Sequence, residues 1–258
     1  MQGGGQGDVN ASRRRLFLVL WGLGVLGAVA GLPYKMALWP PHVVERYPLG
    51  ALLATDVFAN GIVITGLLTY FGLRAGKPLG LGAPVLEGWV AGERVRAQVR
   101  RLFVVALLAG GLSALAIILL EVWVFAPRLP QLAAIPEPAA WKGALGALYG
   151  GVTEELITRL GMFSVTAGVL TRLGVQRTGA CWAANAITSV LFGIMHLSAT
   201  AGLLPLTLLV VSRALLLNGI ASLVFGHLYW TRGLEAAMLA HFAADIVLHV
   251  LPALIPTF

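Results

Sequence analysis

The chain has 258 residues, of which 58% are hydrophobic and only 11% are charged, and its mean hydropathy is +0.86. Soluble domains are typically about half apolar and about a quarter charged. This composition excludes a disordered chain, a coiled coil, a disulfide scaffold and a typical soluble enzyme. The formal net charge is +7, but the basic residues stand mainly at the ends of apolar runs, as the positive-inside rule predicts. We therefore expect a lipid bilayer as the surroundings and no nucleic-acid partner.

In chain order, the first twelve residues are glycine-rich and polar and predict a disordered tail, 1–12. The remainder, 13–258, is predicted to be a single membrane domain, because each apolar run has about the 20 residues that a membrane-spanning helix needs. The fold class is therefore an all-α polytopic membrane helix bundle with about seven transmembrane helices, or eight if one interfacial or re-entrant segment is added. The predicted spans cover approximately residues 13–32, 49–73, 102–126, 143–171, 179–200, 204–230 and 234–255.

Residues 74–101 are the longest charged segment between two spans. Leu86, Trp89 and Val90 are interspersed there among charged residues, most of them basic, which predicts a basic cytoplasmic amphipathic loop with a helix on the membrane surface. With the N-terminus inside, the inner segments hold a clear excess of basic residues over the outer ones. We therefore expect a multi-pass protein of the inner (cytoplasmic) membrane with a cytoplasmic N-terminus. The bias toward Arg, Ala, Gly and Leu is typical of a bacterial protein.

Several ionisable residues fall inside the last four predicted spans, where each costs about 2.5–3.5 kcal/mol if it faces lipid. They must therefore face one another or an internal cavity. Glu155 and Arg159 are four residues apart, share a helix face and are predicted to form an ion pair. Glu154 is rotated from that face by about 100°, so we assign it the chemical role. The set is Glu154, Glu155, Arg159, His196, Arg213, His241 and Asp245.

Two later spans carry further pairs at the same spacing. Phe192 precedes His196 by four residues, and His241 precedes Asp245 by four. An Asp at that spacing can fix the tautomer and orientation of the imidazole ring. Three helices thus each offer a polar pair, as in sites that are built in bundle cores. A stripe of small residues through Glu154 predicts the close approach of a neighbouring helix or room for substrate; it comprises Gly143, Ala147, Gly150 and Gly161.

The motifs EExxxR, FxxxH and HxxxD, in that order on successive apolar segments, resemble the three motifs of the CPBP (CAAX protease and bacteriocin-processing) family of intramembrane proteases. The resemblance covers about residues 140–250, the predicted catalytic core. It implies that Glu154 and His196 activate a water molecule and that His241 and Asp245 lie around the scissile carbonyl. Asp245 departs from the family pattern, which often has Asn there. An ionised Asp only accepts hydrogen bonds, so Asp245 would stay protonated, orient His241 or bind a metal.

The chemistry of these residue types is consistent with hydrolysis of an amide bond. A carboxylate shielded from bulk water is a good general base near neutral pH, and an imidazole opposite it can stabilise a tetrahedral intermediate. Neither step needs a Ser or Cys nucleophile. No cofactor is expected, and the alternative is a catalytic Zn²⁺ held by Glu154, His196 and His241. The zinc motif HExxH is absent from the sequence.

The predicted activity is that of a CAAX-type intramembrane endopeptidase, with Glu155 and Arg159 supporting the site. Its partner would be a protein or peptide substrate that is membrane-associated or lipid-modified. Two alternatives remain open: a non-enzymatic, family-like scaffold or immunity protein that binds a peptide, and a proton-coupled transporter that uses the same acids and histidines as a relay. Outside the core, Arg213 is predicted to pair with Asp56 or Glu121, and Asp56 and Asn60 to form interhelical hydrogen bonds.

Overall fold

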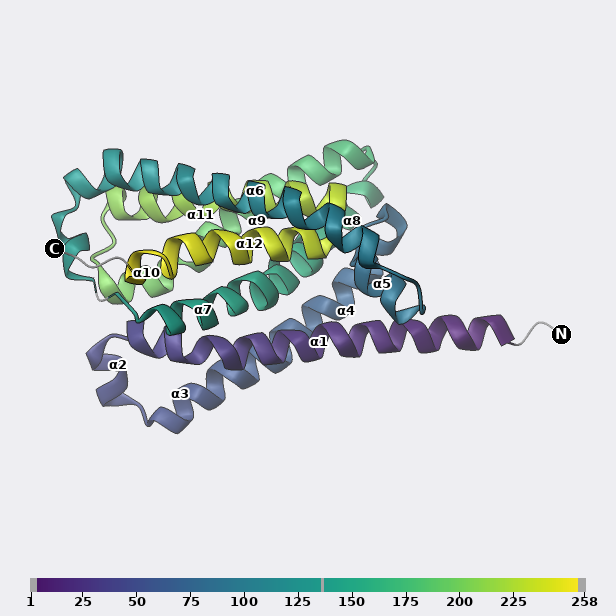
Figure 1. The fold of residues 1–258 in the computed structure, drawn as a ribbon, viewed down its shortest axis with the longest axis horizontal. Helices are drawn as coiled ribbons and strands as arrows, with labels where there is room; N and C mark the ends of the chain where they lie inside the picture. The colour runs from purple at the N-terminus through teal and green to yellow at the C-terminus, as the bar shows by residue number, and fades with distance from the viewer. Residues whose placement is uncertain (1–3, 136, 255–258) are drawn as a thin grey trace.

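The structure is a computed structural model that describes residues 4–135 and 137–254. All regular structure in these two ranges is helical, which confirms the predicted all-α class (Figure 1). The α-helices are α1 (Gly4–Leu38), α2 (Pro41–Arg46), α3 (Leu49–Thr55), α4 (Thr65–Gly76), α5 (Pro84–Val90), α6 (Arg96–Leu120), α7 (Ala140–Leu148), α8 (Ser164–Arg172), α9 (Arg177–Met195), α10 (Leu197–Leu203), α11 (Leu208–Arg232) and α12 (Leu234–His249).

Shorter helices of other pitch connect or interrupt these α-helices. The π-helical segments are η1 (Asp56–Ile64), η3 (Glu121–Phe125), η6 (Tyr149–Glu154) and η7 (Leu156–Phe163), and the 3₁₀ turns are η2 (Lys77–Leu79), η4 (Ala126–Arg128), η5 (Pro130–Ala134) and η8 (Pro252–Leu254). From α7 to α8 the chain stays helical throughout, so residues 140–172 form one continuous helix.

Within the described ranges, five segments are long and apolar enough to cross a membrane: Ala11–Leu38, Leu49–Leu79, Arg96–Arg128, Arg177–Leu203 and Leu208–Arg232. The other two predicted spans are also helical but differ in character. The helix 140–172 carries the charges of Glu154, Glu155 and Arg159, and α12 has only 16 residues. Both lie alongside the other long helices (Figure 1).

Two predictions about the ends and loops need correction. The helix α1 begins at Gly4, so the predicted disordered tail is wrong over residues 4–12, and residues 1–3 lie outside the described ranges. Helix propagation from an already formed segment adds one hydrogen bond per residue, which allows the polar residues to extend the helix. In the segment 74–101, α4 extends to Gly76, the 3₁₀ turn η2 follows it, and α5 is the separate α-helix, whereas residues from Arg96 onward already belong to α6.

The helix 140–172 occupies the middle of the bundle. Its parts α7 and η6 pack against α1 on one side and α12 on another, and η7 packs against α4. The helix α12 is enclosed by α6, α7, α11 and η6 (Figure 1). The hydroxyl of Thr153 donates a hydrogen bond of 2.9 Å to the backbone oxygen of Gly24 in α1. The site residues on the middle helix are therefore surrounded by other helices.

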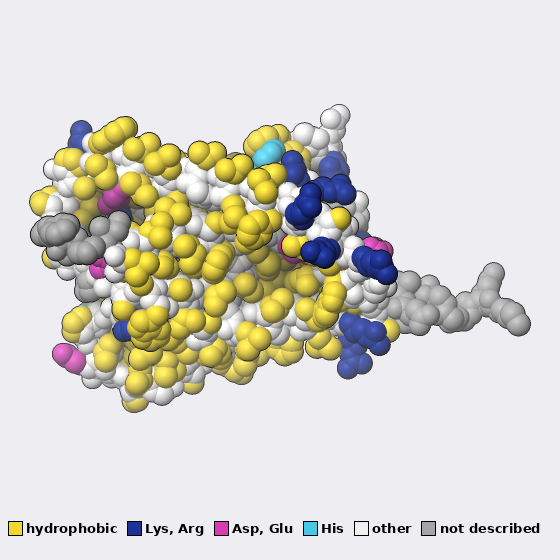
Figure 2. Space-filling model, in the orientation of Figure 1, with side chains coloured by type: hydrophobic (Ala, Val, Ile, Leu, Met, Phe, Trp, Pro, Cys, Tyr) yellow, Lys and Arg dark blue, Asp and Glu magenta, His cyan; other side chains and the backbone are white. Residues whose placement is uncertain are grey.

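The surface is divided into an apolar belt and charged ends. Figure 2 shows hydrophobic side chains along the length of the bundle and Lys and Arg side chains gathered at the end where α1 begins. Leu26, Leu108, Leu112 and Trp123 are each at least 63% exposed, as expected for side chains that face lipid. The described chain starts and finishes at opposite ends of the bundle (Figure 1), which fits an odd number of membrane crossings.

Candidate active site

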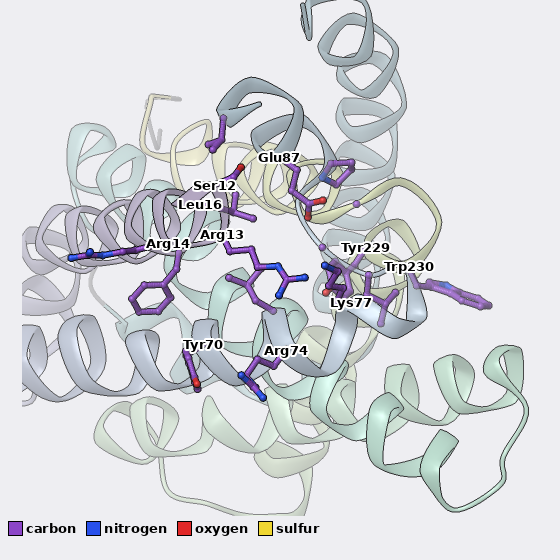
Figure 3. Close-up of a pocket in the computed structure, with 18 of the residues that line it drawn as sticks. Ser12, Arg13, Arg14, Leu16, Tyr70, Arg74, Lys77, Glu87, Tyr229 and Trp230 are labelled. Carbon is purple, nitrogen blue, oxygen red and sulfur yellow. The ribbon is translucent and has the colours of Figure 1, made fainter. Parts of the chain in front are cut away.

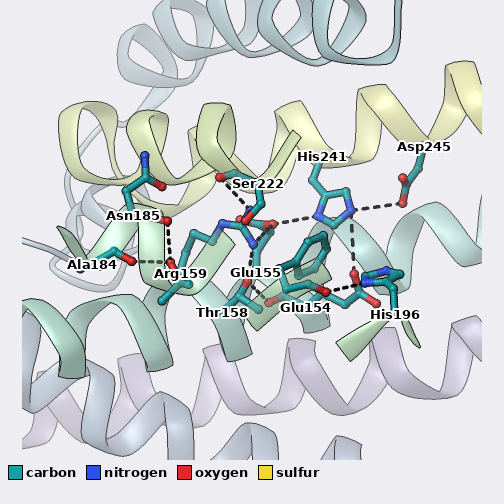
Figure 4. A network of polar contacts seen from close by, with 12 residues as sticks. Glu154, Glu155, Thr158, Arg159, Ala184, Asn185, His196, Ser222, His241 and Asp245 are labelled. Carbon is teal, nitrogen blue, oxygen red and sulfur yellow. Dashed lines mark hydrogen bonds and ion pairs between the residues drawn. The ribbon is translucent and has the colours of Figure 1, made fainter. Parts of the chain in front are cut away.

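Three helices bring the residues of the three motifs into one region (Figure 4). The middle helix contributes Glu154, Glu155 and Arg159, and α12 contributes His241 and Asp245. His196 caps the C-terminus of α9. The structure therefore brings the first and third motifs into direct contact, although they are far apart in the sequence.

The predicted ion pair between Glu155 and Arg159 is confirmed. The Oε1 atom of Glu155 lies 3.2 Å from Nη1 of Arg159, and both side chains are no more than 1% exposed. Arg159 also donates to the hydroxyls of Thr158 and Ser222. Its guanidinium lies 5.0 Å from the ring centroid of Phe192, a cation–π distance. The buried charge is thus paired and hydrogen-bonded, as a buried charge must be.

Glu155 also binds the imidazole of His241. The Nδ1 atom of His241 lies 2.8 Å from Oε1 of Glu155, and because an ionised carboxylate only accepts hydrogen bonds, Nδ1 is the donor. The Nε2 atom on the other side of the ring lies 3.6 Å from Oδ2 of Asp245 and 3.9 Å from Oε2 of Glu154. The side chain that orients this ring most closely is therefore Glu155, whereas the sequence spacing indicated Asp245.

Glu154 differs from its neighbour in exposure and in bonding. Its side chain is 16% exposed, against 0% for Glu155. Among the described residues, the carboxylate of Glu154 accepts no hydrogen bond, and its nearest ionisable partner is His241 at 3.9 Å. Glu154 is thus the acid of the pair whose oxygens remain available to a water molecule.

His196 has a defined tautomer. Its Nδ1 atom lies 2.8 Å from the backbone oxygen of Phe192, and because a carbonyl oxygen only accepts, Nδ1 carries the proton. In the neutral ring, Nε2 then has a free lone pair. The ring of Phe192 lies 4.6 Å from the His196 ring and 5.8 Å from the His241 ring, between centroids. Over the described ranges, no hydrogen bond or ion pair joins His196 directly to Glu154.

The helix that carries the first motif is π-helical on both sides of Glu155. The segments η6 and η7 flank this one residue, and π-helical turns occur frequently at functional sites. A Cβ atom added at Gly150 would lie 3.0 Å from Nε2 of His241 and would also overlap Oδ2 of Asp245. Glycine at this position is therefore what allows α12 to bring His241 and Asp245 against the helix.

The predicted stripe of small residues faces two different neighbours. Gly143 and Gly150 lie against α12, where an added Cβ would meet the backbone of His249 or the side chain of Asp245. Gly161 lies instead against Leu68 of α4. The prediction of close helix approach is confirmed at these positions.

Three residues near the site have no signal in the sequence motifs. Ser222 binds Arg159, and Phe225, three residues later on α11, stacks on the His241 ring with the centroids 4.8 Å apart. The hydroxyl of Thr158 donates to the backbone oxygen of Glu154 at 2.6 Å. The spacing of Ser222 and Phe225 places them on one helix face, but only the tertiary structure shows which face meets the site.

Two other ion pairs lie away from the site. Arg213 pairs with Glu121 at 2.8 Å, which confirms one of the two predicted partners. Asp56 pairs with Lys35 at 2.9 Å and accepts from Asn60 at 2.9 Å. The Asp56–Asn60 contact lies within one helix rather than between helices. These charged side chains therefore pair with one another between helices and do not belong to the site.

The arrangement does not fit the alternative zinc site. Among residues 4–135 and 137–254, no group of three His, Cys, Asp or Glu side chains converges as metal ligands. The three candidate ligands Glu154, His196 and His241 are not grouped around one point in the described ranges. We therefore derive no catalytic step through a metal.

One comparison with known proteins gives a match. Residues 136–247 match the family model described as type II CAAX prenyl endopeptidase Rce1-like. No curated protein and no solved structure matches the chain. The matched segment contains all three motifs and extends from the start of the middle helix into α12.

Proposed function

We propose that this chain, whose residues 136–247 match the model of the Rce1-like type II CAAX prenyl endopeptidases, hydrolyses a peptide bond by means of a water molecule activated by Glu154 and His196. The observation that carries the proposal is the difference in burial and in bonding between the two adjacent acids. Glu155 is fully buried and binds both Arg159 and His241, whereas Glu154 is partly exposed and faces the other nitrogen of His241.

The proposed reaction begins with a water molecule near Glu154. The carboxylate takes one proton from the water, and the water oxygen adds to the scissile carbonyl carbon. The free Nε2 lone pair of His196 accepts a hydrogen bond from the same water and orients it. The addition gives a tetrahedral intermediate with a negative charge on the former carbonyl oxygen.

His241 would stabilise that charge. Its Nδ1–H is held by Glu155, so a second proton on Nε2 would point into the space between Glu154 and Asp245. A preorganised donor of this kind lowers the barrier most when water is excluded. The intermediate then collapses as the C–N bond breaks. Glu154 returns its proton to the departing nitrogen, and the products are an amine and a carboxylic acid, which retains the second proton of the water until it ionises to its carboxylate in solution.

Asp245 has a supporting role in this proposal. As an acceptor, it cannot donate to the oxyanion while ionised. Its Oδ2 lies 3.6 Å from Nε2 of His241, and its Oδ1 lies 4.0 Å from Nε2 of His249. A negative charge at this distance favours the protonated imidazole, which is the form that donates from Nε2. Asp245 would thus act through His241.

The proposed substrate is a membrane-associated or lipid-modified protein or peptide. The site lies in the middle of a bundle whose surface is an apolar belt, so the scissile bond must reach it from within or beside the bilayer. We place the protein in the inner (cytoplasmic) membrane with its N-terminus in the cytoplasm, because the basic end of the bundle holds the start of α1.

The test is a comparison of the membrane proteomes of cells that express the wild-type chain or Glu154→Gln, by mapping N- and C-terminal peptides. A new terminus that appears only with the wild type would establish proteolysis and identify the substrate. If no terminus differs over several growth conditions and Glu154→Gln still complements a deletion, the proposal fails in favour of the non-enzymatic scaffold.

A further inference from the structure

A cavity of about 1160 Å³ lies at the basic end of the bundle, away from the candidate active site (Figure 3). Its wall comes from four parts of the chain: the start of α1, the end of α4 with η2, the segment that leads into α5, and the junction of α11 and α12 at Gly233. None of the three motifs contributes a residue to it.

The cavity is strongly cationic. Five basic side chains line it, against one carboxylate, that of Glu87; the basic residues are Arg13, Arg14, Arg74, Lys77 and Arg232. Within the described part of the chain, none of the five forms an ion pair. Figure 3 shows Arg13 extending into the middle of the cavity between Glu87, Lys77 and Arg74, whereas Arg14 points away. Several cationic side chains without an ion-pair partner in the described chain therefore line the same cavity.

The rest of the lining is mainly apolar. It includes Leu16 and Phe17, which follow Arg13 by about one turn of α1, Leu73 of α4, and Leu81 and Val90 before and at the end of α5. The volume of about 1160 Å³ is slightly above the range of small-ligand pockets, about 300–1000 Å³, and far exceeds what a single phosphate needs. An occupant must therefore combine an anionic group with an apolar body.

We propose that this cavity binds an anionic phospholipid, with its phosphodiester among Arg13, Arg74 and Lys77 and the start of its acyl chains along Leu16, Phe17 and Leu73. Basic pockets between transmembrane helices at one membrane face are suited to anionic headgroups. The position of the cations at the edge of the apolar belt matches the depth of lipid phosphates in a bilayer. This inference does not depend on the proposed peptidase activity.

A bound lipid would add contacts among the parts of the bundle that meet at this end. One wall residue, Tyr229, shares a hydrogen bond of 2.6 Å with Ser164 on the middle helix. On another wall, the backbone N–H of Leu234 donates to the backbone oxygen of Gly82 at 3.0 Å. Occupation of the cavity should therefore stabilise the junction between α11 and α12 and raise the unfolding temperature.

The test measures thermal unfolding of the purified full chain in detergent with added phosphatidylglycerol, phosphatidylcholine or soluble glycerol phosphate. The variant Arg13→Gln/Lys77→Gln removes two cavity cations. Its matched control, Arg15→Gln/Arg101→Gln, removes two exposed arginines that do not line the cavity. We expect phosphatidylglycerol alone to stabilise the wild type and the control, and to bind the cavity variant about 30-fold more weakly.

Two outcomes would overturn the proposal. If phosphatidylglycerol stabilises both double variants equally, its effect is general surface electrostatics. If soluble glycerol phosphate is as effective as the lipid, the cavity takes a free phosphate. Crosslinking of a photoreactive phosphatidylglycerol to the wild-type chain tests the assigned site without any variant. We expect its crosslinks in residues 12–18 and 70–90, and crosslinks confined to other segments would contradict the assigned site.

Discussion

The Nδ1 atom of His241 lies 2.8 Å from Oε1 of Glu155, a residue 86 positions earlier in the chain. The same oxygen lies 3.2 Å from Nη1 of Arg159. One buried carboxylate oxygen thus fixes an imidazole on α12 and a guanidinium on its own helix. The other oxygen of Glu155 is buried with no hydrogen-bond partner among the described residues. Glu155 has no exposed lone pair left for a substrate, which is why we assign the reaction to Glu154.

Exchange of each acid for its amide should separate these roles. Glu154→Gln should abolish cleavage, because the general base is lost, and should leave the unfolding temperature nearly unchanged. Glu155→Gln should lower both activity and stability, because it leaves the buried charge of Arg159 uncompensated, at a cost of about 3–5 kcal/mol. Cleavage assays and thermal unfolding of the two purified variants in detergent measure both effects. A stable but inactive Glu155→Gln beside a fully active Glu154→Gln would reverse our assignment.

Local spacing predicted those parts of the site that lie on a single helix. The i,i+4 rule was sufficient for the Glu155–Arg159 pair, and the small-residue stripe indicated the approach of another helix. The contact between Glu155 and His241 was not predictable, because it depends on how α12 is placed beside the middle helix. Spacing also favoured Asp245 as the partner of the ring, since it is near in sequence. The fold class followed from the composition and from the lengths of the apolar runs.

The sequence patterns did not predict the π-helical segments. The apolar pattern of residues 143–171 predicts an ordinary spanning helix, yet η6 and η7 flank Glu155. An i→i+5 turn changes the direction of every side chain that follows it. The sequence could therefore indicate which residues share the region, but not their distances from one another.

The buried ion pair should show strong energetic coupling. Arg159→Met alone leaves the carboxylate of Glu155 with only His241 as a partner, whereas Glu155→Gln/Arg159→Met removes both charges. We expect the double variant to be more stable than the sum of the single changes predicts, by about 2 kcal/mol. Urea unfolding of the wild type and the three variants in mild detergent gives the coupling energy. Strict additivity would mean that the pair contributes no mutual stabilisation.

Gly150 should tolerate no side chain. In Gly150→Ala, the new methyl group would overlap Asp245 and approach His241, so α12 must shift, at a cost of about 1–3 kcal/mol. We expect at least a tenfold loss of cleavage, because the donor on His241 moves with α12. The matched control is Gly111→Ala on α6, where an added Cβ meets nothing within 4 Å; it should be neutral or stabilising. Equal behaviour of the two alanine variants would contradict this role for Gly150.

Chelation should leave the activity intact. Glu154, His196 and His241 do not converge as three metal ligands in the described ranges. We therefore expect EDTA and 1,10-phenanthroline to leave the cleavage rate within twofold, with a known zinc peptidase as the positive control. Elemental analysis of the purified chain should find less than one zinc per ten molecules. The opposite result would be stoichiometric zinc in the purified chain. Removal of this zinc would abolish cleavage, its return would restore cleavage, and His241→Ala would contain less of it. That result would mean that the three side chains move toward a common point when the metal binds, and it would replace the glutamate-activated water with a metal-bound one.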